Sequence, residues 1–212
     1  MIAHIIPTNI DDRLLSKGVG ALSSGGLVAL PTDTSWSIVC SYKSKDGIKK
    51  LRAISRERDE QRFTLLCSEL SQISDLCNFD NSRFRLINRL APGPYVFILK
   101  TLSMTEKALN LPRREIGIRI PDNPVPIALI KTLGAPLYSI TAKRTMLSQP
   151  IEEDGDEPEA MLFDNGWELE DIAGLDLIFD SGEDQARLFS TVLDVSGDEV
   201  VVIRAGAGAW PR

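Results

Sequence analysis

Short apolar runs alternate with amphipathic helical segments along most of this 212-residue chain. This alternation is typical of an α/β domain, in which helices cover the faces of a central sheet. The predicted strands lie at 27–30, 36–40, 63–67, 95–99, 116–120, 136–141, 175–179, 191–195 and 199–204. The predicted helices lie at 11–23, after the cap at Ser44 or Asp46, at 80–90 and at 125–133. Since no repeat or long linker divides the chain, we expect one domain over 1–212, with a twisted, mostly parallel mixed sheet and flanking helices.

The composition agrees with a globular domain that buries its own core. Hydrophobic residues make up 43% of the chain and charged residues 25%, so the core needs no disulfides to support it. No apolar run approaches the ~18 residues of a membrane span, and residues 1–12 lack the pattern of a secretory signal. The three cysteines, Cys40, Cys67 and Cys77, form no C-x-x-C pair. We therefore expect a cytoplasmic protein with reduced thiols and no membrane partner.

A single histidine limits the chemistry open to this chain. His4 lies near the amino terminus, where an isolated polar residue is usually only solvated. Hydrolytic triads and most zinc sites need a well-placed imidazole. Any catalysis is therefore expected to depend on positioning, on phosphate electrostatics or on a bound metal ion.

Charge is unevenly distributed along the chain. Residues 152–184 hold 14 acidic and no basic side chains, whereas the other 179 residues hold 24 basic and 16 acidic ones, a net charge of +8. So much uncompensated charge at 152–159 predicts an exposed acidic loop. The basic remainder is compatible with a nucleic-acid or nucleotide site. Its densest part, 43–62, is equally compatible with a solvated helix face.

Familiar phosphate and metal motifs are absent. The chain has no G-x-x-x-x-G-K-[ST] sequence, and its glycines at 18–26 follow a helix and precede a strand, the reverse of a dinucleotide fingerprint. The acidic residues at 154–159 do not have calcium-loop spacing. No dedicated metal site is predicted.

Four segments carry polar groups at predicted strand ends or turns: 31–34, 92–94, 117–124 and 136–143. Arg119 stands out because an arginine inside an apolar strand needs an anionic partner or an aqueous cleft. The hydroxyls of Ser139 and Thr141 point to one face at period two. Each segment taken alone also has a structural interpretation, as a turn, a cap or a buried ion pair.

Together, the order and spacing of these segments resemble the YrdC/YciO family of threonylcarbamoyl-adenylate synthase-type domains. The resemblance covers about residues 8–207 and includes P-T-D-T at 31–34, A-P-G-P at 91–94, G-I-R-I-P at 117–121, Ser190-Thr191 and Arg204. The segments at 63–67 and 95–100 look most like the YciO branch. The resemblance implies a YrdC-like α/β fold with a cationic concave cavity.

The resemblance also implies ligands. Active members join L-threonine, bicarbonate and ATP into threonylcarbamoyl-adenylate and pyrophosphate for tRNA modification, and several members are described as double-stranded-RNA binders. ATP and Mg²⁺ are therefore the expected cofactors, with the metal carried on the phosphates. The expected partners are ATP or another nucleotide, L-threonine, and tRNA or double-stranded RNA.

Site residues follow from the same resemblance, position by position. Thr32, Arg119 and Ser139 would bind the threonine-like substrate, with Arg119 as a bidentate clamp on its carboxylate. The nucleotide and its phosphates would be contacted by Arg56, Arg58, Thr141, Lys143 and Arg204. No catalytic side chain is assigned.

The chain departs from the active pattern where phosphates would bind. The K-x-R pair of active synthases aligns with Ser55 and Glu57, an asparagine aligns with Lys143, and a threonine aligns with Glu115. Because phosphoryl transfer depends on cations at the phosphates, three hypotheses stay open. The chain is a nucleotidyltransferase of the synthase type, a non-catalytic member that binds double-stranded RNA or a nucleotide and has lost the K-x-R site, or a protein-interaction subunit whose cavity is vestigial.

Overall fold

A computed structural model describes residues 1–55, 63–111, 114–148 and 158–210. The strands are β1 (Ile2–His4), β2 (Val28–Pro31), β3 (Trp36–Ser41), β4 (Thr64–Leu66), β5 (Cys77–Asn78), β6 (Tyr95–Thr101), β7 (Glu115–Arg119), β8 (Leu137–Thr141), β9 (Leu177–Asp180), β10 (Thr191–Asp194) and β11 (Val201–Arg204). The α-helices are α1 (Asp12–Ser23), α2 (Lys45–Ser55), α3 (Leu70–Leu76), α4 (Asn81–Leu90), α5 (Ser103–Leu109) and α6 (Pro124–Leu133). Three 3₁₀-helices, η2 (Arg144–Met146), η3 (Pro158–Met161) and η4 (Gly166–Asp171), follow β8.

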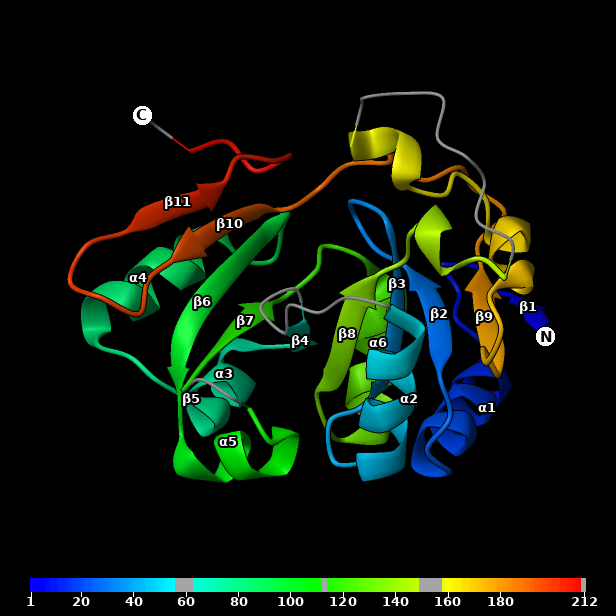
Figure 1. Cartoon of the computed structure of the whole chain (residues 1–212), viewed down its shortest axis with the longest axis horizontal. Helices are drawn as coiled ribbons and strands as arrows, with labels where there is room; N and C mark the ends of the chain where they lie inside the picture. Colours follow the sequence, from blue (N-terminus) through cyan, green and yellow to red (C-terminus); the bar gives the residue numbers. More distant parts are fainter. Residues whose placement is uncertain (56–62, 112–113, 149–157, 211–212) are drawn as a thin grey trace.

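The described strands form one mixed sheet in the order β1-β9-β2-β3-β8-β4-β7-β6-β10-β11, with β5 paired to β6 (Figure 1). A single α/β domain with a mixed sheet and flanking helices is confirmed. The share of parallel pairing is lower than we expected: four of the ten described strand pairs are parallel, and six are antiparallel. One reason is that a short turn joins β2 to β3, and a parallel pair needs a much longer crossover.

Side chains from the two faces of the sheet pack into two cores. On one face, Leu15 and Leu22 of α1 and Leu129 of α6 pack against alternate residues of β2 such as Val28 and Leu30. On the other, side chains of α2, α3, α4 and α5 belong to a second core, which also contains Leu27 and Ala29. Figure 1 shows α2 lying over β3 and β8 on this second face. A strand buried on both faces is apolar throughout, which explains the continuous apolar run that predicts β2.

The helix boundaries follow the sequence closely. Asp11 and Asp80 accept hydrogen bonds from backbone N–H groups of the first turns of α1 and α4, and Asn123 does so for α6. Gly134, with φ of +68°, ends α6 in the left-handed conformation. The expected helices at 11–23, 80–90 and 125–133 are therefore confirmed within a residue. Four short elements, β1, β5, α3 and α5, were not predicted from the sequence.

The predicted acidic loop at 152–159 is described only at its end. Residues 152–157 lie outside the described residues, and Glu159 belongs to η3. None of the described helices is both long and apolar enough to cross a bilayer.

Candidate functional site

The turn between β2 and β3 is organised by the hydroxyl group of Thr32. Thr32 Oγ1 donates to the carbonyl oxygen of Ser35 at 2.7 Å and accepts from the N–H groups of Thr34 and Ser35, each at 3.2 Å. Thr34 Oγ1 lies 3.2 Å from Thr32 Oγ1. Because the Thr32 proton is given to Ser35, Thr34 is the donor in that pair. All of these side chains are buried, so the hydroxyl of Thr32 fixes the turn at the end of β2.

Arg119, the last residue of β7, is buried with only 5% exposure and is held by four hydrogen bonds. Its Nε donates to the carbonyl oxygen of Gly93 at 3.2 Å. Its Nη1 donates to Thr34 Oγ1 at 2.9 Å and to Ser190 Oγ at 2.7 Å. Its Nη2 donates to Asp33 Oδ1 at 2.6 Å, a buried ion pair. A guanidinium has five N–H donors, so one Nη2 hydrogen has no acceptor in the described part of the chain.

Asp33 is the anionic partner that a buried arginine requires. Its Oδ1 also accepts from the backbone N–H of Asp122 at 3.1 Å, which ties the β2–β3 turn to the segment before α6. Its Oδ2 is buried and has no hydrogen bond among the described residues. Burial lowers the pKa of the Arg119 guanidinium from its usual value, and the carboxylate of Asp33 opposes that shift. The ion pair with Asp33 therefore stabilises the charged form of Arg119 inside the protein.

Ser190 and Arg204 extend this network toward β11. Nε and Nη2 of Arg204 both donate to the carbonyl oxygen of Ser190, at 3.1 and 2.9 Å, and its guanidinium lies 4.9 Å from the ring centroid of Phe189. Ser190 Oγ accepts from Arg119, and its own proton has no acceptor in the described chain. Next to it, Thr191 Oγ1 donates to the carbonyl oxygen of Gly208 at 2.6 Å, which holds the carboxyl-terminal tail against β10.

The predicted residues of β8 lie on the same face of the sheet as Arg119. In register across the strands, Ser139 is opposite Thr64, and Leu66 is opposite Arg119. Positions two apart share a face, so Thr141 is also on this face. Ser139 Oγ is used within the sheet, since it donates to the carbonyl oxygen of Thr64 at 2.7 Å. The hydroxyl of Thr141 makes no hydrogen bond among the described residues.

The remaining predicted phosphate residues are divided between described and undescribed parts of the chain. Lys143 follows β8 and is 9% exposed. Arg56, Arg58 and Glu57 lie outside the described residues. Ser55, which aligns with the first cation of the K-x-R pair, is the buried last residue of α2, and its hydroxyl donates to the carbonyl oxygen of Arg52 at 2.8 Å.

The structure thus brings Thr32, Arg119 and Arg204 into one hydrogen-bonded network and places Ser139 and Thr141 on the same face. The roles assigned to these residues stay predictions. Three side chains that bind Arg119, those of Asp33, Thr34 and Ser190, were not assigned as site residues. All three lie in segments that the sequence singled out, Asp33 and Thr34 in P-T-D-T and Ser190 in the Ser190-Thr191 pair. The sequence did not show that Asp33 is the partner of Arg119.

Carboxylates do not gather into a metal site here. In the described ranges, no group of three or more His, Cys, Asp or Glu side chains could hold a metal ion. Two acidic residues of the 152–184 segment form ion pairs with arginines: Arg144 Nη2 lies 2.6 Å from Glu168 Oε2, and Arg187 Nη1 lies 3.3 Å from Asp164 Oδ2. The carbonyl oxygen of Asp164 also accepts from Trp36 Nε1 at 3.3 Å. This part of the acidic segment is therefore packed against the fold.

The fold and this network define an α/β protein with a buried, hydroxyl-lined arginine at the place where β2 and β7 end. A family model for Sua5, YciO and YrdC proteins, described as "Telomere recombination", matches residues 20–206. The protein YciO of Escherichia coli K12 is 33% identical over 97% of this chain and 95% of its own length. The chain belongs to the Sua5/YciO/YrdC family, as the sequence resemblance predicts.

Solved structures and more distant relatives agree with this assignment. The crystal structure of E. coli YciO matches 99% of this chain and 97% of that chain, with a TM-score of 0.80. The structure of Pyrococcus abyssi Sua5 complexed with L-threonine matches the fold with a TM-score of 0.81 at 19% identity, over 97% of this chain and 57% of that one. A mouse threonylcarbamoyl-AMP synthase is 28% identical over 86% of this chain and 62% of its own length.

Proposed function

We propose that this protein acts in the cytoplasm, that it binds L-threonine and an adenine nucleotide, and that it also binds RNA. The two small ligands would bind at the strand-end network, the hydrogen-bonded group of Thr32, Asp33, Thr34, Arg119, Ser190 and Arg204. The observation that carries the proposal is the buried Arg119 with hydroxyl groups on its Nη1 and a carboxylate on its Nη2. An arginine of this kind is suited to a ligand carboxylate. Two relatives support the choice of ligand, since Sua5 was solved with L-threonine and the mouse relative is a threonylcarbamoyl-AMP synthase.

In the proposed complex, the ligand carboxylate accepts from groups that still have a proton to give. The remaining Nη2 hydrogen of Arg119 and the hydroxyl of Ser190 are two such donors. A bidentate contact between Arg119 and the ligand carboxylate needs a second N–H of the guanidinium. One of the acceptors that Arg119 now uses must therefore be displaced. The hydroxyl acceptors, Thr34 and Ser190, are the easiest to replace, because a hydroxyl can rotate and become a donor to the incoming anion. Thr32 and Ser139 line the site with hydroxyls that the fold already uses.

The nucleotide part of the proposal rests on cations and hydroxyls around this network. Thr141, Lys143, Arg204, Arg56 and Arg58 are the proposed contacts to the nucleotide and its phosphates. ATP would bring Mg²⁺ on its phosphates, which agrees with a site built from hydroxyls and cations, with no group of metal-binding carboxylates in the described part. When bound, the metal neutralises phosphate charge, while the protein side chains position the two ligands.

A non-catalytic role is the second candidate, favoured by Ser55. A buried serine bonded to its own helix supplies no positive charge where active synthases have a lysine. In this version the protein binds nucleotide or RNA without making an adenylate. RNA binding should then weaken as salt rises, because each phosphate contact releases counterions.

Mass spectrometry separates the two versions. Purified protein is given ATP, Mg²⁺, L-threonine and bicarbonate, and threonylcarbamoyl-adenylate and pyrophosphate are measured against a control without protein. Product above the control supports the enzyme, whereas ATP and threonine binding without product supports the binding module.

Calorimetry of L-threonine binding then tests the site itself, using Arg119→Ala and the milder Ser190→Ala. Both variants should weaken binding, and Arg85→Ala, a change to an exposed arginine of α4, should not. Unchanged affinity in folded Ser190→Ala and Arg119→Ala would refute the proposed site.

A further inference from the structure

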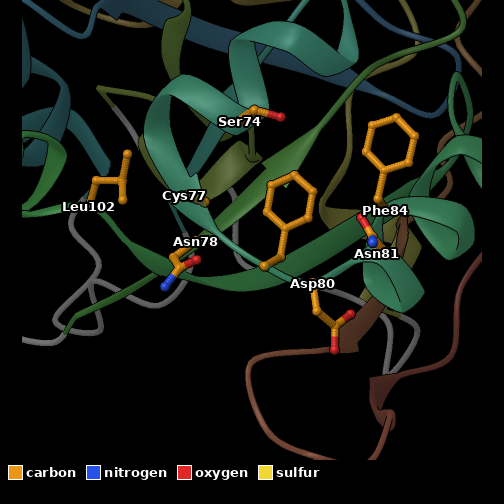
Figure 2. Close-up of a pocket in the computed structure, with 8 residues that line it drawn as sticks. Ser74, Cys77, Asn78, Asp80, Asn81, Phe84 and Leu102 are labelled. Carbon is orange, nitrogen blue, oxygen red and sulfur yellow. The ribbon is translucent and has the colours of Figure 1, made fainter.

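A cavity of about 310 Å³ lies between α3, β5 and α4, away from the strand-end network. β6 connects the two places: Tyr95 begins it beside Gly93, whose carbonyl binds Arg119, and Thr101 ends it opposite Cys77 of β5. Seven residues of strand span roughly 20 Å, so the cavity is a separate place on the molecule. Figure 2 shows four of the lining residues: Asn78 and Asp80 lie on the segment that joins α3 to α4, and Asn81 and Phe84 lie in the first turn of α4.

The cavity combines aromatic rings with hydrogen-bonding groups. Phe79 and Phe84 line it, and Phe84 is 40% exposed, so its ring is accessible to a ligand in the cavity. Ser74, Asn78, Asp80 and Asn81 also line it, so four of its eight lining residues carry polar side chains. A purely apolar ligand would leave those groups without partners.

The polar groups around the cavity have unused hydrogen-bonding capacity. Asp80 Oδ1 accepts from the N–H of Arg83 at 2.8 Å to cap α4, and its other oxygen has no partner among the described residues. The side-chain amides of Asn78 and Asn81 make no hydrogen bond in the described part of the chain. Each amide offers both donors and an acceptor, and the carboxylate offers an acceptor for an amino group. These donors and acceptors can pair with the N–H and C=O groups at the edge of a planar heterocyclic ring.

Positive charge is concentrated on α4, the helix that carries Phe84. The ten residues of α4 include three arginines and no acidic residue. Arg83 is engaged, since its guanidinium donates to the carbonyl oxygens of Val195, Gly197 and Asp198. Arg85 and Arg89 are exposed, one helical turn apart, and neither forms an ion pair with the described residues. They follow Phe84 along α4 and are suited to phosphate groups.

We propose that this cavity binds a nucleobase, through stacking on Phe84 and hydrogen bonds to Asn78, Asp80 and Asn81, with Arg85 and Arg89 contacting the attached phosphates. The volume is at the lower end for ligand pockets, about 300–1,000 Å³, and suits one base with its ribose. The base belongs either to a free nucleotide or to an unpaired nucleotide of an RNA. Both ligands have an aromatic ring that stacks, a polar base edge that forms hydrogen bonds, and a phosphate group.

The first experiment detects binding at the cavity itself. The full-length protein, labelled with ¹⁵N, is titrated with adenosine, cytidine, guanosine and uridine monophosphates, and the side-chain amides of Asn78 and Asn81 are followed by NMR. Shifts of these amides with at least one nucleotide, lost in Phe84→Ala, are the expected result. No shift with any nucleotide, combined with unchanged RNA affinity in Phe84→Ala, overturns the proposal.

The second experiment measures affinity for a fluorescently labelled single-stranded RNA by anisotropy. Stacking of one base contributes ~1–3 kcal/mol, so Phe84→Ala should weaken binding about 5- to 150-fold. Replacing both Arg85 and Arg89 with alanine should reduce the slope of log affinity against log salt by about 1.4, since each single-strand phosphate contact contributes ~0.7. Trp167→Ala is the matched control, because Trp167 is also an exposed aromatic residue, at 63%, and does not line the cavity.

The two experiments together identify the source of the base and separate this proposal from the function proposed above. Amide shifts with loss of RNA affinity in Phe84→Ala assign the base to RNA. Amide shifts without any RNA binding assign it to a free nucleotide, and the cavity proposal stands although the proposed RNA binding fails. RNA binding that is unaffected by Phe84→Ala and by the double arginine variant, without amide shifts, overturns the cavity and leaves the RNA function intact.

Discussion

Replacing Asp33 with asparagine tests the ion pair at the centre of the strand-end network. The substitution keeps the shape of the side chain and an Oδ1 that can accept from Arg119 Nη2 and from the N–H of Asp122. It removes the negative charge opposite a guanidinium that is only 5% exposed. Loss of one partner from a buried pair costs about 3–5 kcal/mol. Since hydrogen bonds to the neutral amide remain, we expect the free energy of unfolding to fall by about 2–3 kcal/mol.

Thermal and urea unfolding, followed by tryptophan fluorescence, measure this loss. For a protein of this size, 1 kcal/mol corresponds to roughly 2–4 °C, so Tm should fall by about 4–12 °C. The double variant with Arg119→Met completes a mutant cycle, and Asp33→Asn should cost much less in that background. Arg85→Gln, at an exposed position, is the control and should change stability by less than ~0.5 kcal/mol. A loss below about 1 kcal/mol, or equal losses with and without Arg119, would refute the pairing as a source of stability.

Three further predictions follow from packing, burial and hydrogen bonding. Gly20→Ala in α1 should raise the free energy of unfolding by about 0.5–1 kcal/mol, because nothing lies within 4 Å of the added Cβ. Gly18→Ala in the same helix should lower it, because the Cβ would lie 2.8 Å from Phe179 Cζ; stabilisation in both variants would contradict this packing. Burial raises the pKa of Cys40 and of Cys77 to about 12, so both thiols stay protonated at pH 8 and should react with iodoacetamide only after denaturant is added; fast labelling of the native protein would contradict their burial. Arg83→Ala should speed hydrogen exchange in the β10–β11 hairpin, because three carbonyl groups there lose their guanidinium partner; unchanged exchange would show that Arg83 does not hold the hairpin.

The elements with the strongest local pattern could be predicted from the sequence. Caps such as Asp80 and Asn123 hydrogen-bond to the first turn of their own helix, and the left-handed Gly134 ends α6 one residue after the predicted end. The apolar run at 27–30 predicted a strand, and the structure confirms it as β2, which is buried on both faces. The short elements β5 and α3 were not predicted, because their few residues give no clear period and are stabilised by neighbours.

The candidate site was predicted less completely than the fold. The position of Arg119 inside an apolar strand predicted an anionic partner or an aqueous cleft, and the structure shows an anionic partner, Asp33. The identity of the partner could not be predicted, because 86 residues separate the two and their contact depends on how β2 and β7 are placed in the sheet. Thr32 was predicted as a ligand contact, and its hydroxyl turns out to hold the β2–β3 turn as well.

The sequence by itself determined the alternation of strands and helices and the family, and it showed that Arg119 needs an anionic partner or an aqueous cleft, because these depend on local spacing and residue chemistry. Only the tertiary structure decided the strand order, the share of parallel pairing and the network of Asp33, Thr34 and Ser190 around Arg119. It also decided that Phe84 and the amides of Asn78 and Asn81 line one cavity. Contacts between residues distant in the chain depend on how the whole sheet and its helices pack, and periodicity along the sequence does not report that packing.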